Sequence, residues 1–244
     1  MLTVVTWLWS TPGFRSAYSA AHVNTLFRSV EKHYPHEFRK VCITDMPEGI
    51  DADVDIVPLW EDFRHLPAPR KDQSHPGCYG RLKIFAREMK DILGPRVVSL
   101  DLDAVITGDL TPLWHRPEPF VIWAPNRPYP HARYPKQTWN ASMWMMDTGA
   151  FPHVWDKFDG DESARDAVRR GFYPSDQGVL EASLRNHRVG TWTQADGVLM
   201  YSEMRKNEQA ATLPDHARIV FFNGSHDYWL RDVQAQAPWI LDHL

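Results

Sequence analysis

Hydrophobic and polar positions alternate along the first part of the chain with two different periods. Residues 3–9 alternate and are rich in β-favouring side chains, a pattern that predicts a strand. Residues 17–33 have the helical period instead, because their apolar side chains recur at i, i+3, i+4 and i+7. The apolar side chains of this predicted amphipathic helix are Val23, Leu26, Phe27 and Val30.

Strand and helix patterns continue to alternate as far as residue 100. Strands are predicted at 39–44, 55–60 and 96–100, and a helix is predicted at 79–93. Residues 61–76 contain three prolines and several charges, which indicates a loop. This order of elements predicts an α/β fold with a largely parallel sheet. Ligands of such sheets bind in the crevice outside the carboxyl ends of the strands.

The pattern becomes less regular after residue 120. Proline and aromatic residues indicate a loop at 124–139. We find no internal repeat, low-complexity tract or linker, so residues 1–244 are predicted to form a single domain. The further elements predicted here are strands at 120–124, 142–147 and 219–224 and helices at 162–170 and 175–184.

The overall charge excludes some classes of partner, and the cysteines indicate a cellular compartment. A net charge of −4 over 244 residues gives no basic field for nucleic acid or an anionic membrane surface. The apolar start at residues 2–9 is too short to span a bilayer, so no membrane span is expected. Cys42 and Cys78 lie far apart without metal-binding spacing, which favours a reducing, cytoplasmic compartment.

Two aspartates follow directly on the apolar strand predicted at 96–100. In the stretch RVVSLDLDAVITGDL, Asp101 and Asp103 stand two residues apart, so their side chains share one face of an extended segment. Two ionised carboxylates at this place repel each other, and burial disfavours both charges. A divalent cation that prefers oxygen ligands, Mg²⁺ or Mn²⁺, resolves both problems and keeps coordination positions for substrate phosphates.

Several phosphate chemistries are compatible with such a pair. Phosphatases of the haloacid-dehalogenase type carry a DxDx(T/V) string, which residues 101–105 match. That string normally follows the first strand of its domain, whereas residues 1–95 already have an α/β pattern here. A nucleotidyltransferase would usually have a glycine-rich basic loop after its first strand, and residues 10–16 contain a single glycine. The remaining chemistry is glycosyl transfer, in which the cation neutralises the departing diphosphate of a nucleotide sugar.

Several segments, taken together, resemble glycosyltransferase family 8 and related bacterial and phage glycosyltransferases. LDLDAVITGDLTPLW is similar to the DxD segment of that family, and residues 6–51 resemble its opening strand, helix and second strand. In order and approximate spacing the resemblance covers nearly the whole chain. The other matching segments are YGRL (79–82), WNASMWMMDTGAF (139–151), SDQGVL (175–180) and ARIVFFNGSHDYW (217–229).

The resemblance implies the GT-A fold, a Rossmann-like sheet with the DxD motif at a strand end. It also implies metal-dependent transfer of a hexose, with retention, from a nucleoside diphosphate sugar (a UDP-sugar) to an acceptor hydroxyl, with Mn²⁺ or Mg²⁺ as cofactor. The protein would act in the cytoplasm of a bacterium or of a phage-infected host. The acceptor stays open among glycans, lipid-linked sugars, protein side chains and modified DNA bases. The alternatives are a metal-dependent phosphatase of the haloacid-dehalogenase type and a non-catalytic nucleotide-sugar-binding protein.

The resemblance also implies roles for individual residues. Asp101 and Asp103 would bind the metal, with Asp101 also near the ribose of the donor. Arg81 would contact the diphosphate or the donor sugar, since a guanidinium fork suits paired oxygens. Asp176 and Gln177 are the predicted catalytic residues: Asp176 would hold a donor hydroxyl, and Gln177 would lie near the anomeric carbon. The other predicted donor-binding residues are Asn140 and Ser142 for sugar hydroxyls and Thr6, Trp7 and Asp45 for the nucleotide pocket.

The closing segment departs from the family's pattern. Phe221 stands where the family usually supplies a histidine as third metal ligand, and Asn223 stands where related sequences can carry that histidine. The family's Lys-Pro corresponds to Asp227 and Tyr228 here. His226 is the nearest imidazole, so we expect it to bind the metal from a shifted position.

Overall fold

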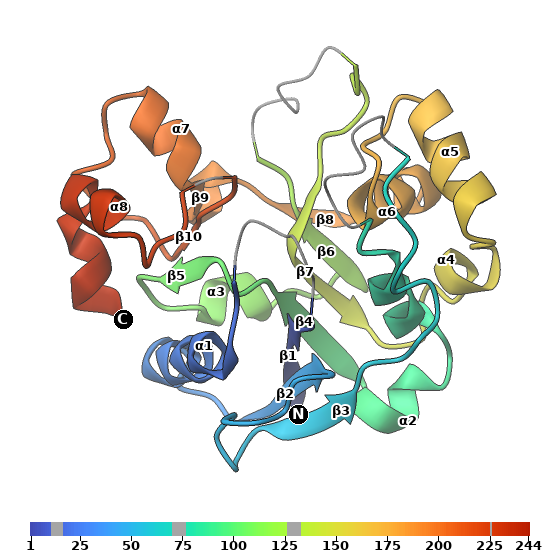
Figure 1. Cartoon of the computed structure of the whole chain (residues 1–244), viewed down its shortest axis with the longest axis horizontal. Helices are drawn as coiled ribbons and strands as arrows, with labels where there is room; N and C mark the ends of the chain where they lie inside the picture. The colour runs from blue at the N-terminus through green and yellow to red at the C-terminus, as the bar shows by residue number, and fades with distance from the viewer. Residues whose placement is uncertain (11–16, 70–76, 126–132, 225) are drawn as a thin grey trace.

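The computed structural model describes residues 1–10, 17–69, 77–125, 133–224 and 226–244. Its centre is a seven-stranded sheet with the order β3-β2-β1-β4-β7-β6-β8, beside a three-stranded sheet with the order β5-β10-β9 (Figure 1). The large sheet contains β1 (Leu2–Leu8), β2 (Phe38–Thr44), β3 (Asp55–Pro58), β4 (Arg96–Leu100), β6 (Phe120–Trp123), β7 (Asn140–Asp147) and β8 (Gly190–Trp192). The small sheet contains β5 (Ala104–Ile106), β9 (Val198–Met200) and β10 (Ile219–Phe221).

Parallel pairing dominates the large sheet. β1 pairs in parallel with both β2 and β4, β2 with β3, and β6 with β8. β7 is antiparallel to both of its neighbours, β4 and β6. The predicted α/β class with a mostly parallel sheet is therefore confirmed. Because β1 to β4 all run in the same direction, the residues that follow them gather at one edge of the sheet.

Alternating side chains of the large sheet supply two separate cores. Val4 and Leu8 pack with α1 (Ala20–His33) and α3 (Thr111–Trp114), whereas Val5 and Trp7 pack on the opposite face. Each fully buried aliphatic side chain there contributes about 1.5–3 kcal/mol. The helices on this opposite face are the 3₁₀ helix η1 (Tyr79–Phe85), α2 (Met89–Leu93), α4 (His153–Asp156), α5 (Asp161–Arg169) and α6 (Asp176–Leu184).

A third core joins the small sheet to the C-terminal elements. Val105, Leu199 and Val220 of its three strands pack against Tyr201 and Trp239. Figure 1 shows these C-terminal elements in orange and red, on the side of the molecule away from α4, α5 and α6. The elements here are the 3₁₀ helix η2 (Gln194–Asp196), α7 (Tyr201–Lys206), α8 (Arg231–Gln236) and the 3₁₀ helix η3 (Pro238–His243).

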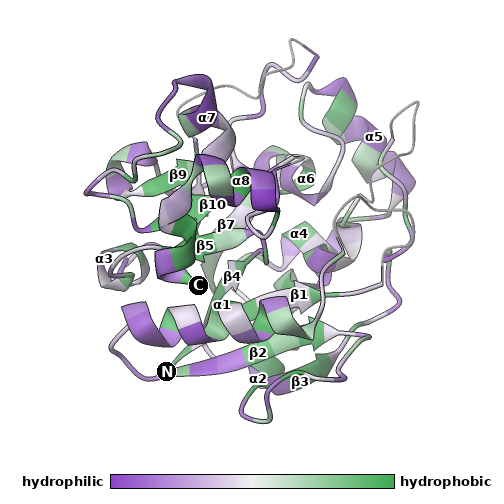
Figure 2. Cartoon of the chain, turned by 60° about the vertical axis from the view of Figure 1, so that its left-hand side comes forward, coloured by the Kyte–Doolittle hydropathy of each residue, from purple (hydrophilic) through white to green (hydrophobic). Residues whose placement is uncertain are grey.

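The first predicted helix is confirmed as α1. All four of its predicted apolar side chains are buried, and polar and apolar segments alternate along the helix (Figure 2). The helix begins after Ser19, whose backbone N–H donates to His22 Nδ1 at 3.0 Å. The helices predicted at 162–170 and 175–184 are likewise found as α5 and α6, and Ser175 occupies the N-cap of α6.

The helix predicted at 79–93 was wrong as a continuous element. The chain forms η1, then an extended residue at Ala86 (φ −62°, ψ 149°), then the short helix α2. The carbonyl of Gly80 accepts a hydrogen bond from Trp60 Nε1 at 2.6 Å. A Cβ at Gly80 would lie 3.2 Å from the backbone oxygen of Asp62. This close approach of another segment favours the tight, buried turn over a regular helix with a solvent-facing side.

Several short strands after residue 100 were not predicted. β5, β8 and β9 have three residues each, too few to show a period of alternation. Residues 219–224 contain the predicted last strand, β10, but it belongs to the small sheet. The loops predicted at 61–76 and 124–139 fall partly on residues 70–76 and 126–132, which lie outside the described residues. Within the described parts of the chain, no helix combines the length and the apolar character needed to cross a bilayer.

Candidate active site

The two aspartates of the DxD motif connect the two sheets. Asp101 directly follows β4, and its backbone N–H donates to the carbonyl of Ser142 on β7 at 2.9 Å. Residues 102 and 103 form a turn, and not the extended strand end that was expected. The carbonyl of Asp103 accepts from the backbone N–H of Phe222 at 2.8 Å. The large sheet therefore positions Asp101, whereas the closing segment after β10 positions Asp103.

Arg81 lies at the centre of a buried charge cluster. Its Nη1 donates to Asp101 Oδ1 at 2.9 Å, and its Nε lies 3.3 Å from Asp176 Oδ2. Nη2 donates to the carbonyl of Ala141 at 2.8 Å, and the guanidinium carbon lies 5.6 Å from the ring centroid of Trp7. The side chains of Arg81 and Asp176 are only 9% and 8% exposed, whereas that of Asp101 is 28% exposed. One arginine thus holds two acids from different elements, and Asp101 keeps a face open to solvent.

Asp176 is the first residue of α6 and lies deeper than Asp101. Its backbone N–H donates to the carbonyl of Gly77 at 2.9 Å, which joins α6 to the turn before η1. Burial raises the pKa of Asp176 to about 6; Arg81 opposes this rise, and the charge of Asp101 adds to it. Asp176 therefore titrates close to neutral pH, which is characteristic of carboxyl groups in functional sites.

The predicted residues Asn140, Ser142 and Gln177 meet at the start of β7. Asn140 Oδ1 accepts from the backbone N–H of Ser142 at 2.8 Å, and Gln177 Oε1 accepts from the backbone N–H of Ala141 at 3.3 Å. Asn223 Nδ2 lies 3.4 Å from Ser142 Oγ, so the closing segment reaches the same place. The peptide of residue 141 is therefore held between Gln177 on one side and Arg81 on the other.

Thr6 and Trp7 face the interior. Thr6 Oγ1 donates to the carbonyl of Leu100 at 2.9 Å, and Trp7 Nε1 donates to Ser99 Oγ at 2.9 Å. Both side chains thereby fasten β1 to β4 just before Asp101. Trp7 also lies beneath the guanidinium of Arg81. In this structure the two residues support the charge cluster from inside the sheet.

Asp45 follows β2 at the same edge of the sheet. Its Oδ1 accepts from the backbone N–H of Ser10 at 3.0 Å, and its Oδ2 pairs with Arg64 Nη2. Ser10 follows β1, so Asp45 joins the ends of two neighbouring strands. The structure does not bring Asp45 into contact with the cluster of Arg81.

The structure shows where the residues that depart from the family's pattern lie in the closing segment. Phe221 is fully buried and stacks on Trp123, with ring centroids 4.7 Å apart, so its position belongs to the core. Asn223 Oδ1 is buried and accepts no hydrogen bond from the described residues. The ring of His226 lies 6.0 Å from that of Tyr201. Asn223 is therefore the closing-segment side chain whose contact with the predicted donor-binding residues is seen directly.

Asp103 and a second buried acid, Asp227, both act on Tyr228. Asp227 is 6% exposed, like Asp103, and both negative charges add to the effect of burial, which raises the pKa of the Tyr228 hydroxyl. Among the described residues, no three or more His, Cys, Asp and Glu side chains are grouped so as to hold a metal ion by themselves. The assignment of His226 as a third ligand therefore stays a prediction.

Sequence reasoning missed the polar residues that brace this site. Glu181 is fully buried and accepts three hydrogen bonds from Thr138 and Trp139, just before β7. Gln137, also fully buried, accepts from the backbone N–H of Tyr173 at 2.9 Å. A signal for Glu181 was present, because it lies four residues after Gln177 and so on the same face of α6. Gln137 had no comparable signal.

A pocket of about 550 Å³ adjoins the carboxyl ends of β1 and β2. Leu8 and Met46, which line it, are the sequence neighbours of the predicted residues Trp7 and Asp45. Its position agrees with the general location of ligand crevices in open α/β sheets. The remaining lining residues are Ser19, Ala20, Ala21, Asn24, Thr25, Arg28, Glu48 and Gly49.

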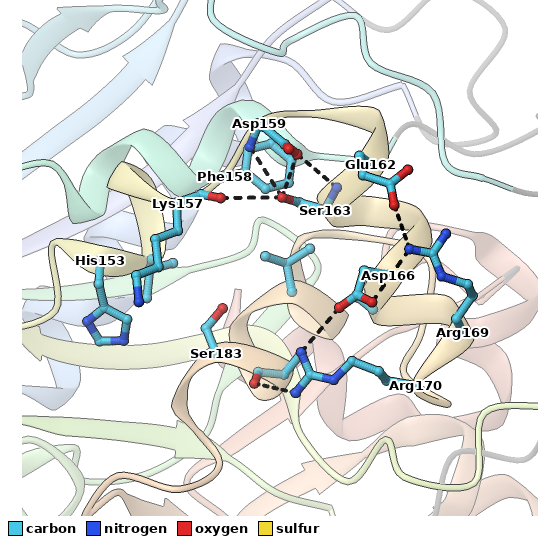
Figure 3. A pocket seen from close by; sticks show the side chains of 14 residues that line it. His153, Lys157, Phe158, Asp159, Glu162, Ser163, Asp166, Arg169, Arg170 and Ser183 are labelled. Atoms are coloured by element: carbon cyan, nitrogen blue, oxygen red, sulfur yellow. Dashed lines mark hydrogen bonds and ion pairs between the residues drawn. The ribbon is translucent and has the colours of Figure 1, made fainter.

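Another pocket, of about 420 Å³, lies between α4, α5 and α6 and contains none of the predicted site residues. Its charged side chains largely pair with one another, as Figure 3 shows. Arg169 pairs with Glu162 at 2.6 Å and Arg170 with Asp166 at 3.4 Å. Because these charges are satisfied within the protein, we do not assign the reaction to this pocket.

Solved structures share the fold of this chain, whereas comparisons of its sequence find no match. No protein-family model matches the chain, and no curated protein matches it in sequence. Among solved structures, an active-site mutant of LgtC, with glutamine replaced by glutamate, has a TM-score of 0.64 at 15% identity, covering 98% of this chain and 95% of LgtC. The galactosyltransferase LgtC in complex with donor and acceptor sugar analogues has a TM-score of 0.63 at 15% identity, covering 99% and 96%.

A second glycosyltransferase has the same fold over part of its length. The apo form of GlyE from Streptococcus pneumoniae TIGR4 has a TM-score of 0.57 at 13% identity, covering 98% of this chain and 60% of GlyE. The resemblance to GT-A glycosyltransferases drawn from the sequence is thus confirmed at the level of the fold. The chain has the α/β fold of LgtC over nearly its full length.

Proposed function

We propose that this protein is a metal-dependent glycosyltransferase that moves a hexose from a nucleoside diphosphate sugar, a UDP-sugar, to an acceptor hydroxyl. The observation that carries the proposal is the cluster of Arg81, Asp101 and Asp176 at the carboxyl end of β4, in a chain with a glycosyltransferase fold. Buried, mutually paired charges are costly for stability alone. Their position at the sheet edge supports a role in binding a polar donor.

The donor set fits a hard divalent cation. Mg²⁺ and Mn²⁺ use oxygen ligands, and Mg²⁺ is commonly held by one or two carboxylates together with substrate phosphates and waters. Asp101 and Asp103 supply such carboxylates, and the buried Asn223 Oδ1 offers a further oxygen from the closing segment. His226 remains the candidate nitrogen ligand. When bound, the cation would act as a Lewis acid on the leaving diphosphate.

The same geometry supports the roles that we propose for residues around the donor sugar. Asp176 and Gln177 reach the site from the first turn of α6, and Asn140 and Ser142 face it from β7. Asp176 would accept a hydrogen bond from a donor hydroxyl, and Arg81 would keep its charge balanced. LgtC has a glutamine in its active site; Gln177 is our candidate for a comparable place beside the anomeric carbon. A same-face displacement with retention agrees with the absence of an assigned nucleophile.

The pocket beside Leu8 and Met46 supports a nucleoside site at the carboxyl ends of β1 and β2. Its volume of about 550 Å³ falls within the range of small-molecule sites, roughly 300–1,000 Å³. Asp45, at the ends of β1 and β2, would then border the nucleotide, whereas Thr6 and Trp7 would support it from below. We expect the reaction to take place in the cytoplasm of a bacterium or of a phage-infected host.

A donor screen tests the proposal directly. Nucleoside diphosphate sugars are added with Mn²⁺, and both the melting temperature and nucleotide release are measured. A true donor raises the melting temperature by mass action and is slowly hydrolysed, with release of UDP, and EDTA abolishes both effects. If a UDP-sugar binds without any turnover, in the presence of simple glycan acceptors, the protein is a binding module. Release of inorganic phosphate from simple monoesters would instead favour the phosphatase.

A further inference from the structure

Glu181 is a buried carboxylate outside the set of residues that would touch the donor. Its side chain is fully buried on α6. A buried charge is strongly unfavourable unless it is hydrogen-bonded or paired. Thr138 N–H donates to Oε2 at 2.8 Å, Trp139 N–H donates to Oε2 at 2.9 Å, and Thr138 Oγ1 donates to Oε1 at 2.6 Å. Arg185 Nη2 adds an ion pair at 3.2 Å.

The segment that Glu181 holds leads directly into the candidate site. Residues 138 and 139 precede Asn140, the first residue of β7. One helical turn before Glu181, Gln177 accepts from the backbone N–H of Ala141. Since residues four apart lie on one face of a helix, α6 contacts this segment at two successive turns. The two contacts fix the register between α6, which carries Asp176 and Gln177, and β7.

Gln137 fastens the same segment from the other side. Its Nε2 donates to the carbonyl of Trp139 at 2.8 Å, and its Oε1 accepts from the backbone N–H of Tyr173 at 2.9 Å. The backbone N–H of Lys136 also donates to the carbonyl of Gly171 at 3.1 Å. Residues 136–139 are therefore bonded both to the turn before α6 and to α6 itself. Glu181 supplies the side-chain contacts nearest to the site.

We propose that Glu181 is a positioning residue that sets the place of Gln177 and Asp176 against β7. The expected effect on turnover rests on the proposed function. The register of α6 against β7 is a property of the fold and does not depend on that function. An error of about 1 Å in the placement of reacting groups can lower a rate by 10²-fold. Loss of the Glu181 contacts would therefore lower turnover more than it lowers the affinity for donor.

The kinetic test compares Glu181→Ala with two other variants. Glu181→Gln keeps a carbonyl oxygen for the two backbone N–H groups and an amide for the Thr138 hydroxyl, so it should rescue function. Asp196→Ala is the matched control, because Asp196 Oδ2 accepts from Thr193 N–H at 2.8 Å and from Thr193 Oγ1 at 3.0 Å, outside the candidate site. Initial rates of UDP release are measured against donor concentration with Mn²⁺, together with melting temperatures.

Turnover is expected to fall about 10- to 100-fold in Glu181→Ala, with a much smaller change in KM. Glu181→Gln and Asp196→Ala should keep turnover close to that of the unaltered protein. Should Glu181→Ala fail to fold, Thr138→Val removes only the bond to Oε1 and is expected to lower turnover in the same direction by a smaller factor. Equal turnover in Glu181→Ala and Asp196→Ala, at equal folded fraction, would overturn the proposal.

Amide hydrogen exchange separates this inference from the proposed function. In Glu181→Ala we expect faster exchange at Thr138 and Trp139 and also at Ala141, whose N–H is bonded to Gln177 and not to Glu181. Unchanged exchange at Ala141 would contradict the register role. If no donor is turned over by the unaltered protein while exchange at Ala141 rises in the variant, the proposed function fails and the role of Glu181 stands.

Discussion

The two aspartates of the DxD motif lie in different electrostatic surroundings. Asp101 is held by the large sheet and is paired with Arg81, so its charge is balanced within the protein. Asp103 is held by the closing segment, and its charge and that of Asp227 both act on the hydroxyl of Tyr228. On our account, a charged side chain holds the first half of the motif, whereas a backbone hydrogen bond from the closing segment positions the second half. Removing a charge should therefore have different consequences on the two sides.

Arg81 is expected to give the largest effect. Arg81→Ala leaves Asp101 and Asp176 beside each other without their cation, and the loss of one partner from a buried pair costs about 3–5 kcal/mol. The free energy of unfolding, measured by urea titration, should fall by that amount. Arg28→Ala is the control, since its pair with Asp51 is exposed and such pairs contribute about 0–1 kcal/mol. Equal losses in both variants would refute the idea of a preorganised cluster.

Asp103 is expected to matter for turnover more than for stability. Asp103→Ala should lower Mn²⁺-dependent UDP release by about 10²–10³-fold, since it removes electrostatic stabilisation of the departing diphosphate. The melting temperature without ligand should change less than in Arg81→Ala, because the backbone carbonyl of residue 103, which accepts from Phe222, remains in the variant. The measurement is UDP release at saturating donor. A variant that keeps most of this activity would show that the motif does not bind the cation.

The contribution of Asp176 to the free energy of unfolding is expected to depend on pH. Its folded-state pKa is raised to about 6 from 3.8, so the unfolded chain loses this proton at a lower pH than the folded protein does. The stabilisation from Asp176 is thus complete below pH 3.8 and is lost as the pH rises to about 6. Asp176→Asn, which does not titrate, should gain stability relative to the unaltered protein across this window, by about 2–3 kcal/mol.

Urea titrations of both proteins at several pH values check this expectation. Other carboxylates titrate in both proteins, so the difference between the two isolates Asp176. A difference that stays constant with pH would mean that Asp176 is ionised normally in the folded protein. In that case the burial of this group has no effect on its charge.

Asn223 should give the smallest effect. If its buried Oδ1 completes the cation shell, Asn223→Ala weakens Mn²⁺ binding in the presence of UDP by about 10-fold. Calorimetric titration with Mn²⁺ measures the change, and His226→Ala is the matched variant from the same segment. Weaker binding in His226→Ala alone would assign the third ligand to the histidine expected from the sequence.

The regular half of the fold could be predicted from the sequence because period and burial agree there. Val4, Leu8, Val23 and Val30 pack on one another as the alternating and helical periods require. The small sheet could not be predicted, since strands of three residues carry no readable period and depend on tertiary partners. The turn at Asp103 could not be predicted for a similar reason. It depends on the hydrogen bond from Phe222, which lies 119 residues later in the sequence.

The candidate site shows the same division between local and long-range information. The motifs indicated Arg81, Asp101 and Asp176 as site residues, and the structure joins them in one cluster. Their mutual pairing was not foreseen, because it depends on how η1 and α6 meet across the end of β4. The supporting role of Glu181 likewise depends on a contact 43 residues away in the sequence.

The most direct test of the central claim is a crystal structure of the protein with Mn²⁺ and UDP, with anomalous diffraction data collected for manganese. The account predicts an anomalous peak bound by both Asp101 and Asp103 and by oxygens of the diphosphate, with the nucleoside toward the ends of β1 and β2. A nucleotide bound at another place, or manganese that contacts neither aspartate, would contradict it.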